Sequence, residues 1–203
     1  FILSHKLNLD YNQLKQIWLV AGLDQLEWLH FRYNKVTNIY AVADLNNLQR
    51  LNFNHNQVTN LSPLANLNQL TALEFRHNQV TDLSPIGELQ NLTWLRLGHN
   101  QVSSLLPLAG LTNLRKLEAS QNKVINLHPL ASLKSLRWLD LSNNRVSDLL
   151  PLANLDQLER LDISSNQITD LTPLRNLKNL THLKVNDNRL ETLASLANLD
   201  QLT

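Results

Sequence analysis

The sequence of 203 residues contains no cysteine, no methionine and only four glycines. Without cysteine, the chain has no disulfide bond, no thiol nucleophile and no cysteine-ligated zinc or iron–sulfur site. The compartment stays open, because secreted and cytosolic proteins can both lack cysteine. No apolar run reaches the length of about 18 residues that a membrane-spanning helix needs, and no basic segment precedes a long apolar core at the N-terminus. The sequence therefore predicts no contact with a membrane.

The chain also lacks an excess of charge of either sign. Its 18 lysines and arginines are balanced by 17 aspartates and glutamates, which gives a formal charge of +1. Such a chain has no overall field that attracts nucleic acid, and its basic residues follow no known nucleic-acid-binding motif. Glycine-rich phosphate loops, G-x-S-x-G and H-E-x-x-H are absent too. We therefore expect no nucleic-acid partner, no catalytic residues and no cofactor.

What the sequence does contain is a repeat of 22 residues that never slips in register. Residues 92–113, LTWLRLGHNQVSSLLPLAGLTN, show its pattern of Leu-x-x-Leu-x-Leu-x-x-Asn. The apolar alternation before the asparagine predicts a short strand, and the later apolar residues, spaced by three, predict a 3₁₀-like return segment. Nine asparagines follow one another at intervals of 22 residues: Asn12, Asn34, Asn56, Asn78, Asn100, Asn122, Asn144, Asn166 and Asn188.

One such unit cannot bury its own apolar side, so neighbouring units must stack and share a continuous core. Residues 22 positions apart then become neighbours in space, about 4.8 Å apart on parallel strands. Proline fits a bend on the return segment better than a sheet, because it donates no backbone hydrogen bond. All six prolines occupy one column of the repeat: Pro63, Pro85, Pro107, Pro129, Pro151 and Pro173.

The LxxLxLxxN pattern, the 22-residue period and the return segments LSPLANLNQL and LLPLANLDQL resemble the leucine-rich repeat family, in particular its bacterial, internalin-like branch. The resemblance implies an α/β fold. Its form would be a right-handed solenoid, or horseshoe, with a parallel β-sheet on the concave face and short 3₁₀-like or irregular return limbs on the convex face. We expect one domain over residues 1–203, with about nine repeats over 4–201. The sequence shows no recognisable helical N-terminal cap and no C-terminal flanking domain, so we expect either a fragment of a longer chain or ends that self-associate. The resemblance further implies a secreted or cell-surface location, although a cytoplasmic one stays open.

Function is expected on the concave face, where the outward strand positions differ from repeat to repeat. Tryptophan and arginine are enriched at the energetic centres of protein interfaces. Family members commonly bind proteins with this face. An alternative is that the tryptophans pack over their neighbours, with Lys116 between Trp94 and Trp138 in cation–π contacts. The predicted partner-binding residues are Trp28, His30, Arg32, Arg50, Arg76, Trp94, Arg96, Glu118, Trp138, Asp140 and Asp162.

The charges of these residues divide the predicted face into two halves. Glu118, Asp140 and Asp162 lie on three adjacent strands, where like charges destabilise a sheet. Either Lys116 and Arg160 neutralise this row, or it forms a shallow negative groove for a basic side chain. The other half is basic, through His30, Arg32, Arg50, Arg76 and Arg96. Opposite charges on one sheet indicate a protein partner of mixed charge with a defined docking direction.

Two further polar columns have structural explanations. Each asparagine of the repeat can pair with backbone groups in the turn after its strand, which predicts a scaffold role. His55, His77 and His99 form a column that invites a metal hypothesis. A straight column brings at most two rings onto one ion, so we expect no metal and instead a polar edge with pH sensitivity. Trp18 and Tyr40 are neighbours on the return segment, where we expect them to shield the first repeats.

The sequence thus predicts a non-enzymatic recognition module that binds a protein through its concave face. A structural role, with contacts through the ends or the convex side, is the alternative. An engineered repeat scaffold also fits the regular framework with its varied surface positions.

Overall fold

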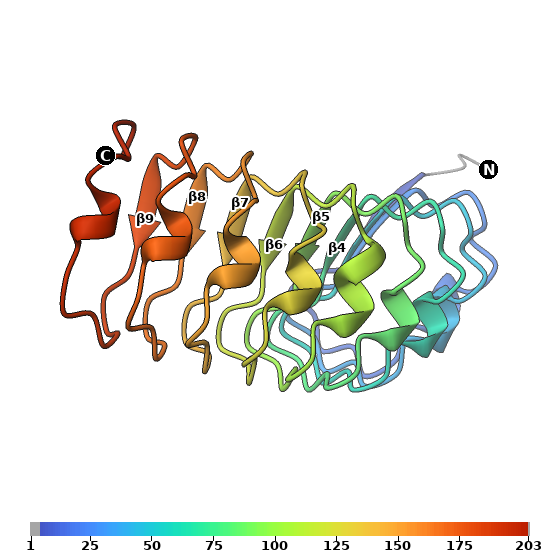
Figure 1. Cartoon of the computed structure of the whole chain (residues 1–203). Coiled ribbons are helices and arrows are strands. Elements are labelled where there is room, and N and C mark those ends of the chain that lie inside the picture. Colours follow the sequence, from blue (N-terminus) through green and yellow to red (C-terminus); the bar gives the residue numbers. More distant parts are fainter. Residues whose placement is uncertain (1–4, 203) are drawn as a thin grey trace.

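Each 22-residue unit forms one turn of a coil that contains a three-residue strand and a short 3₁₀ helix (Figure 1). The computed structural model describes residues 5–202. Residues 1–4 and 203, which include the start of the predicted repeat range, lie outside the described residues, so the domain bounds of 1–203 stay a prediction. The strands are β1 (Lys6–Asn8), β2 (Trp28–His30), β3 (Arg50–Asn52), β4 (Ala72–Glu74), β5 (Trp94–Arg96), β6 (Lys116–Glu118), β7 (Trp138–Asp140), β8 (Arg160–Asp162) and β9 (His182–Lys184).

The return segments carry the 3₁₀ helices, on the side of the coil opposite the strands. Proline stands at the second position of η3 to η8, where its fixed φ suits the bend and its missing N–H is not needed. The helices are η1 (Trp18–Val20), η2 (Tyr40–Val42), η3 (Ser62–Leu64), η4 (Ser84–Ile86), η5 (Leu106–Gly110), η6 (His128–Leu130), η7 (Leu150–Leu152), η8 (Thr172–Leu174) and η9 (Ala194–Leu196).

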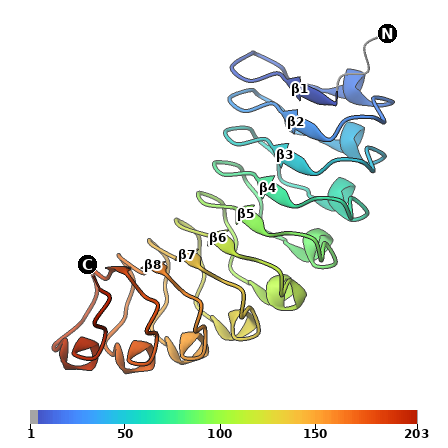
Figure 2. The same cartoon turned by 90° about the horizontal axis from the view of Figure 1, so that it is seen from above.

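The nine strands form one parallel sheet in sequence order, with each residue paired to the residue 22 positions later. Figure 2 shows that the repeats follow an arc with the strands on its inner side and the 3₁₀ helices on its outer side. This confirms the predicted solenoid with a concave parallel sheet and short return limbs. The outward strand residues therefore line the inner curve in three continuous columns.

Leucines and phenylalanines from successive repeats fill the space between the sheet and the return segments. The leucine at the centre of each strand from β2 to β8 is almost fully buried. Phe31, Phe53 and Phe75 stack in the first half of the core, with centroids 5.6 and 5.7 Å apart. Burial of this continuous apolar column provides the main driving force for folding, at about 25 cal/mol per Å² of apolar surface removed from water.

The asparagine column holds the turn that follows each strand, as predicted. The amide nitrogen of Asn100 donates to the carbonyls of Leu97 at 3.0 Å, Gly98 at 3.3 Å and Phe75 at 3.0 Å, and its oxygen accepts the Val80 N–H at 2.9 Å. The side chain thus connects two consecutive repeats. It also stabilises the preceding residue, His99, in the left-handed region at φ 55°, where a non-glycine side chain is otherwise unfavourable.

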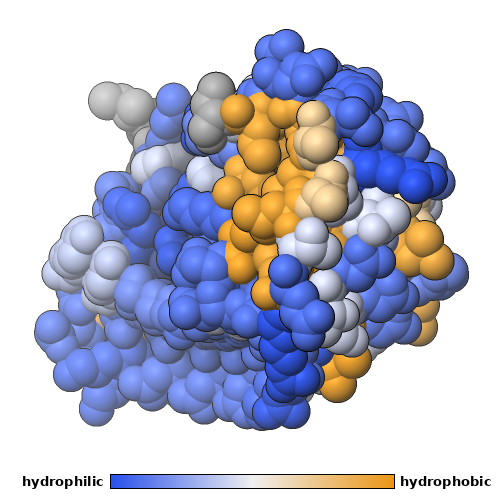
Figure 3. Space-filling view, turned by 60° about the vertical axis from the view of Figure 1, so that its left-hand side comes forward, coloured by the Kyte–Doolittle hydropathy of each residue, from blue (hydrophilic) through white to orange (hydrophobic). Residues whose placement is uncertain are grey.

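Apolar side chains reach the surface at the last described repeat. Figure 3, in which the side with the C-terminus is turned forward, shows a continuous apolar area there. Leu193 is exposed, and Leu190, Leu196 and Leu202 are only partly buried. Within residues 5–202, none of the helices has the length and apolar character needed to cross a bilayer.

Candidate functional site on the concave face

Lys116 lies between the indole rings of Trp94 and Trp138 at the centre of the concave sheet. The register of β5, β6 and β7 places the three residues side by side, with the Lys116 Nζ 4.1 Å from the Trp94 ring centroid and 2.8 Å from that of Trp138. Only 5% of the Lys116 surface is exposed. Burial, reinforced by the charge of Arg96, lowers the pKa of Lys116 to about 8. Both indoles therefore take part in internal packing, as the alternative interpretation predicted.

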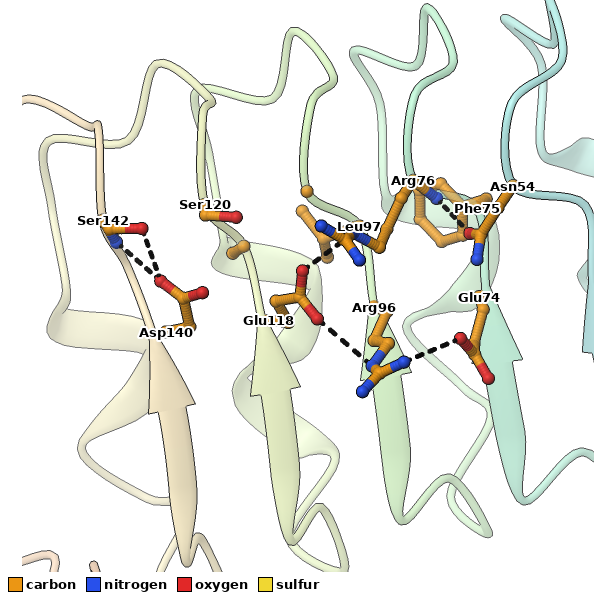
Figure 4. A network of polar contacts seen from close by, with 12 residues as sticks. Asn54, Glu74, Phe75, Arg76, Arg96, Leu97, Glu118, Ser120, Asp140 and Ser142 are labelled. Atoms are coloured by element: carbon orange, nitrogen blue, oxygen red, sulfur yellow. Dashed lines mark hydrogen bonds and ion pairs between the residues drawn. The ribbon is translucent and has the colours of Figure 1, made fainter. Parts of the chain in front are cut away.

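Glu118 is the centre of an ion-pair network that crosses three repeats (Figure 4). Its two carboxylate oxygens face the Nε of Arg76 at 2.8 Å and the Nε of Arg96 at 3.1 Å. These contacts are charge attractions and not aligned hydrogen bonds. Arg96 also donates from Nη1 to Glu74 at 3.3 Å. Burial raises the pKa of Glu118, and the two arginines oppose that rise.

Glu118 forms its ion pairs with Arg76 and Arg96, whereas the first of the two alternatives for the acidic row named Lys116 and Arg160. The cations that pair with Glu118 come from the half of the face that the sequence assigned to a separate basic surface. Arg76 reaches Glu118 across the repeat that contains Gly98. A Cβ at Gly98 would lie 2.9 Å from the Ser120 Oγ and 3.3 Å from a Glu118 oxygen. Glycine at this position therefore leaves room for the Glu118 carboxylate.

The remaining acidic side chains of the row serve the turns that follow their strands. One oxygen of Asp140 accepts from both the N–H and the hydroxyl of Ser142, at 2.9 and 2.7 Å. Asp162 binds Ser164 in the same way, at 3.0 and 2.6 Å. These carboxylates are partly exposed but held in place. At the other end of the sheet, Arg32 pairs with Asp10 at 2.7 Å, which neutralises one more member of the predicted basic half.

One hollow on the concave face is left open above Ala72. This residue stands in a column of large side chains, between Arg50 and Trp94. The hollow has a volume of about 250 Å³, and it is also lined by Trp28 and Glu74. Four predicted site residues border it: Trp28, His30, Arg50 and Trp94.

His30 helps to shape one wall of this hollow. Its ring lies 3.7 Å from that of Trp28, centroid to centroid. Burial lowers the pKa of His30 below its ordinary value, although Asp10 opposes the change. The imidazole is therefore neutral at pH 7, and Arg50 supplies the positive charge of the hollow.

The histidine column forms a continuous stack on the edge of the sheet. Ring centroids are 4.0 Å apart between His55 and His77 and 3.7 Å apart between His77 and His99, and Tyr33 and Tyr11 extend the stack. Burial and the neighbouring positive charges lower the pKa of His77 to about 4. Among residues 5–202, no group of three or more potential ligands is arranged to hold a metal ion. Stacked rings lie parallel, so their nitrogens do not converge on one point.

Comparison with known proteins identifies the architecture. The family described as leucine-rich repeats (2 copies) matches residues 24–66, 46–88, 134–176 and 156–198. The chain belongs to the leucine-rich repeat family. No curated protein sequence matches it.

Solved structures place this leucine-rich repeat chain near the bacterial internalins. An internalin (InlF) from Listeria monocytogenes is 35% identical with a TM-score of 0.94, over 96% of this chain and 58% of that one. Internalin C2 from the same species is 40% identical with a TM-score of 0.86, over 90% and 81%. A Leptospira interrogans leucine-rich repeat protein is 28% identical with a TM-score of 0.80, over 97% and 59%. The chain thus spans less than two thirds of two of these structures.

Leucine-rich repeat proteins typically mediate protein–protein interaction, and the internalin-like members are in general not enzymes. In this leucine-rich repeat chain, the sequence predicted four of the residues that surround the hollow but not Ala72, above which the hollow lies. A small residue in a column of large ones was the available signal, and it points to Ala72. Sequence reasoning also missed Glu74 as a partner of Arg96 and Gly98 as the position that leaves space for Glu118.

Proposed function

We propose that the concave face binds a protein partner, and that the hollow above Ala72 receives one of the partner's side chains. The observation that carries this proposal is the open space above Ala72, a small residue between Arg50 and Trp94 in a column of large side chains. Interface anchors are usually large side chains that fill such pockets, and tryptophan and arginine are enriched around them. The family's general role in protein binding supports the proposal.

The walls of the hollow favour an aromatic side chain of the partner. The Trp94 indole offers a stacking surface, and the Arg50 guanidinium offers a cation–π contact from the opposite wall. A cationic side chain fits less well, because Arg50 repels it and Glu74 is already paired with Arg96. The carboxylate of Glu74 and the hydroxyls of Thr71 and Thr93 line the same hollow, where they can accept from a tyrosine hydroxyl.

Filling the hollow tests the proposal with little effect on the fold. Ala72→Leu adds bulk at an outward position, and the control His182→Leu places the same leucine in the same column at the far end of the sheet without adding bulk. The immobilised protein and both variants are incubated with cell-surface extracts, and retained proteins are quantified by mass spectrometry. The Kd of any purified candidate is then measured by calorimetry. We expect a partner that binds the parent and His182→Leu equally and Ala72→Leu at least about tenfold more weakly.

The outcome that contradicts the proposal is a partner whose Kd is unchanged by Ala72→Leu. The variant Trp94→Ala is less useful as a first test, because it also uncovers Lys116 and changes the internal packing. Circular dichroism and thermal unfolding of each variant confirm that the fold is retained.

A second candidate, an assembly role, is favoured by the apolar area at the last described repeat (Figure 3). Exposed and partly buried leucines such as Leu193 and Leu196 provide a surface that a second copy can cover. Sedimentation velocity over a wide concentration range tests this role, and a strict monomer at the highest concentration argues against it.

A further inference from the structure

Two large aromatic side chains lie on the flank of the first two repeats, away from the concave sheet. Trp18 begins η1 and Tyr40 begins η2, and their exposed fractions are 65% and 60%. Both side chains thus leave most of their surface to solvent, and the prediction that they shield the first repeats stays a prediction. The remaining members of this column are much smaller than indole: Ser62, Ser84, Leu106, His128, Leu150, Thr172 and Ala194. The fold does not require an aromatic ring at this position.

Trp18 and Tyr40 both line a hollow of about 750 Å³. Its volume falls within the range of about 300 to 1,000 Å³ that is usual for small-ligand sites. Ile17, which is buried, and Ala41 contribute apolar surface to the lining. Ala41 occupies the column that holds proline in later repeats, so a small residue replaces a bulky ring beside Tyr40.

Tyr40 also borders a second hollow of about 300 Å³, which continues toward the third repeat. Asn60 and Pro63 line this second space, and the Asn60 amide lies 3.5 Å from the Tyr40 hydroxyl. The two hollows share Thr37, Asn38 and Tyr40 in their linings and therefore adjoin along the stack of repeats. This arrangement suits a ligand that is a short chain of similar units.

The polar side chains that line the larger hollow carry amides, two hydroxyls and two ammonium groups. Gln16, Asn38 and Gln57 supply the amides, and Lys15 and Lys35 supply the positive charge. The Asn38 oxygen accepts the Tyr40 N–H at 2.8 Å, which fixes this amide at the rim. No carboxylate is among the described residues that line either hollow. The site is therefore positive and rich in neutral hydrogen-bonding groups.

These features match the chemistry of a carbohydrate with acidic groups. The C–H faces of a sugar ring pack against aromatic faces, amides pair with its hydroxyls, and lysines pair with carboxylate or sulfate. A purely apolar ligand leaves the amides unpaired, and a basic ligand is repelled by both lysines. We propose that Trp18 and Tyr40 form a binding site for an acidic oligosaccharide. The site is separate from the concave face and does not depend on the function proposed for that face.

Titration of the intact 203-residue chain with defined sugars tests this proposal. The probes are tetragalacturonate and a chondroitin sulfate tetrasaccharide, and maltotetraose is the neutral control. Binding is followed by NMR through the indole N–H signal of Trp18. We expect an acidic probe to shift this signal at about 10 mM, which detects a Kd of about 1 mM. The shift should weaken as salt is added, because exposed charges are screened.

Matched variants assign the binding to the two rings. Trp18→Ala and Tyr40→Ala should each weaken binding about tenfold. Leu106→Ala and Leu150→Ala occupy the same column with 69% and 67% exposure and should leave it unchanged. In variants without Trp18, backbone amide signals of the two hollows replace the indole signal. Because all four side chains are exposed, we expect no loss of folding, which thermal unfolding verifies.

Three results overturn the proposal. The first is no shift of the Trp18 signal with either acidic probe. The second is binding that survives in both Trp18→Ala and Tyr40→Ala, which indicates non-specific attraction to lysines. The third is maltotetraose binding as strongly as the acidic probes while Lys15→Gln/Lys35→Gln has no effect, which removes the acidic requirement.

Discussion

Replacing Asn100 with alanine should destabilise the protein far more than the same change at Asn12. Asn100 is buried between two repeats, donates to three backbone carbonyls and accepts the Val80 N–H. Asn12 occupies the same repeat position but is exposed, and it donates only to the carbonyls of Leu9 and Asp10, at 2.9 and 3.2 Å. The two substitutions are therefore chemically identical and differ only in what the side chain holds together.

The expected magnitudes follow from the groups that lose their partners. In Asn100→Ala, the buried Val80 N–H is left unpaired, which costs about 1 to 3 kcal/mol, and each lost hydrogen bond adds about 0.5 to 1.5 kcal/mol. Allowing for non-additivity, we expect a loss of about 3 to 5 kcal/mol in the free energy of unfolding. In Asn12→Ala, water replaces the amide at the exposed carbonyls, so the loss should stay below about 1 kcal/mol.

Urea unfolding followed by circular dichroism measures the total loss, and amide hydrogen exchange locates it. Exchange is needed because a repeat array can open locally instead of unfolding in one step. We expect the Val80 amide to exchange much faster in Asn100→Ala. Equal losses for Asn100→Ala and Asn12→Ala, or an unchanged Val80 exchange rate, would refute the scaffold role of the asparagine column.

Three further predictions concern the charged groups. Glu118→Gln removes the anion that faces both Arg76 and Arg96, although Arg96 keeps its contact with Glu74, and should cost about 1 to 3 kcal/mol. The exposed pair lost in Glu159→Gln should cost less than about 0.5 kcal/mol in urea unfolding; equal costs would contradict the network. Lys116 should titrate with a midpoint near 8 in NMR experiments, and its midpoint should rise toward 10.5 in Trp138→Ala. Because the folded state disfavours the charged ammonium, its contribution to stability rises between pH 8 and 10.5, and a flat profile would argue against the sandwich. The pKa of His77 is about 4 in the folded chain against 6.5 in the unfolded chain, so between pH 6.5 and 4 the unfolded chain binds more protons. The free energy of unfolding should therefore fall by about 1 to 2 kcal/mol as the pH drops from 6.5 to 4, and by less in His77→Gln.

The sequence by itself determined the course of the backbone. A 22-residue period without insertions specifies which residues become neighbours, because each unit must repeat the strand, the turn and the return segment of the one before. The leucines of the strands, the proline column and the asparagine column each have one local environment in every unit. Their burial and hydrogen bonds could therefore be predicted from one repeat and applied to the others.

The tertiary structure alone decided how the long side chains of the concave face are paired. Arg76 reaches past the neighbouring repeat to Glu118, because Gly98 leaves space between them. Lys116 lies between two indoles, where cation–π contacts offset part of the hydration that its ammonium loses on burial. These contacts depend on side-chain rotamers and on the curvature of the sheet, and the repeat pattern of the sequence specifies neither.

The folded structure likewise decided where the hollows lie, because each hollow arises where a small side chain lies beside large ones. Ala72 is a small residue between large ones, and Ala41 stands where later repeats carry proline. The sequence displayed both alanines, but the volumes beside them depend on where Trp94, Trp18 and Tyr40 place their rings. Period and polarity thus fixed the scaffold, and the packing of a few large side chains against small ones fixed the candidate binding sites.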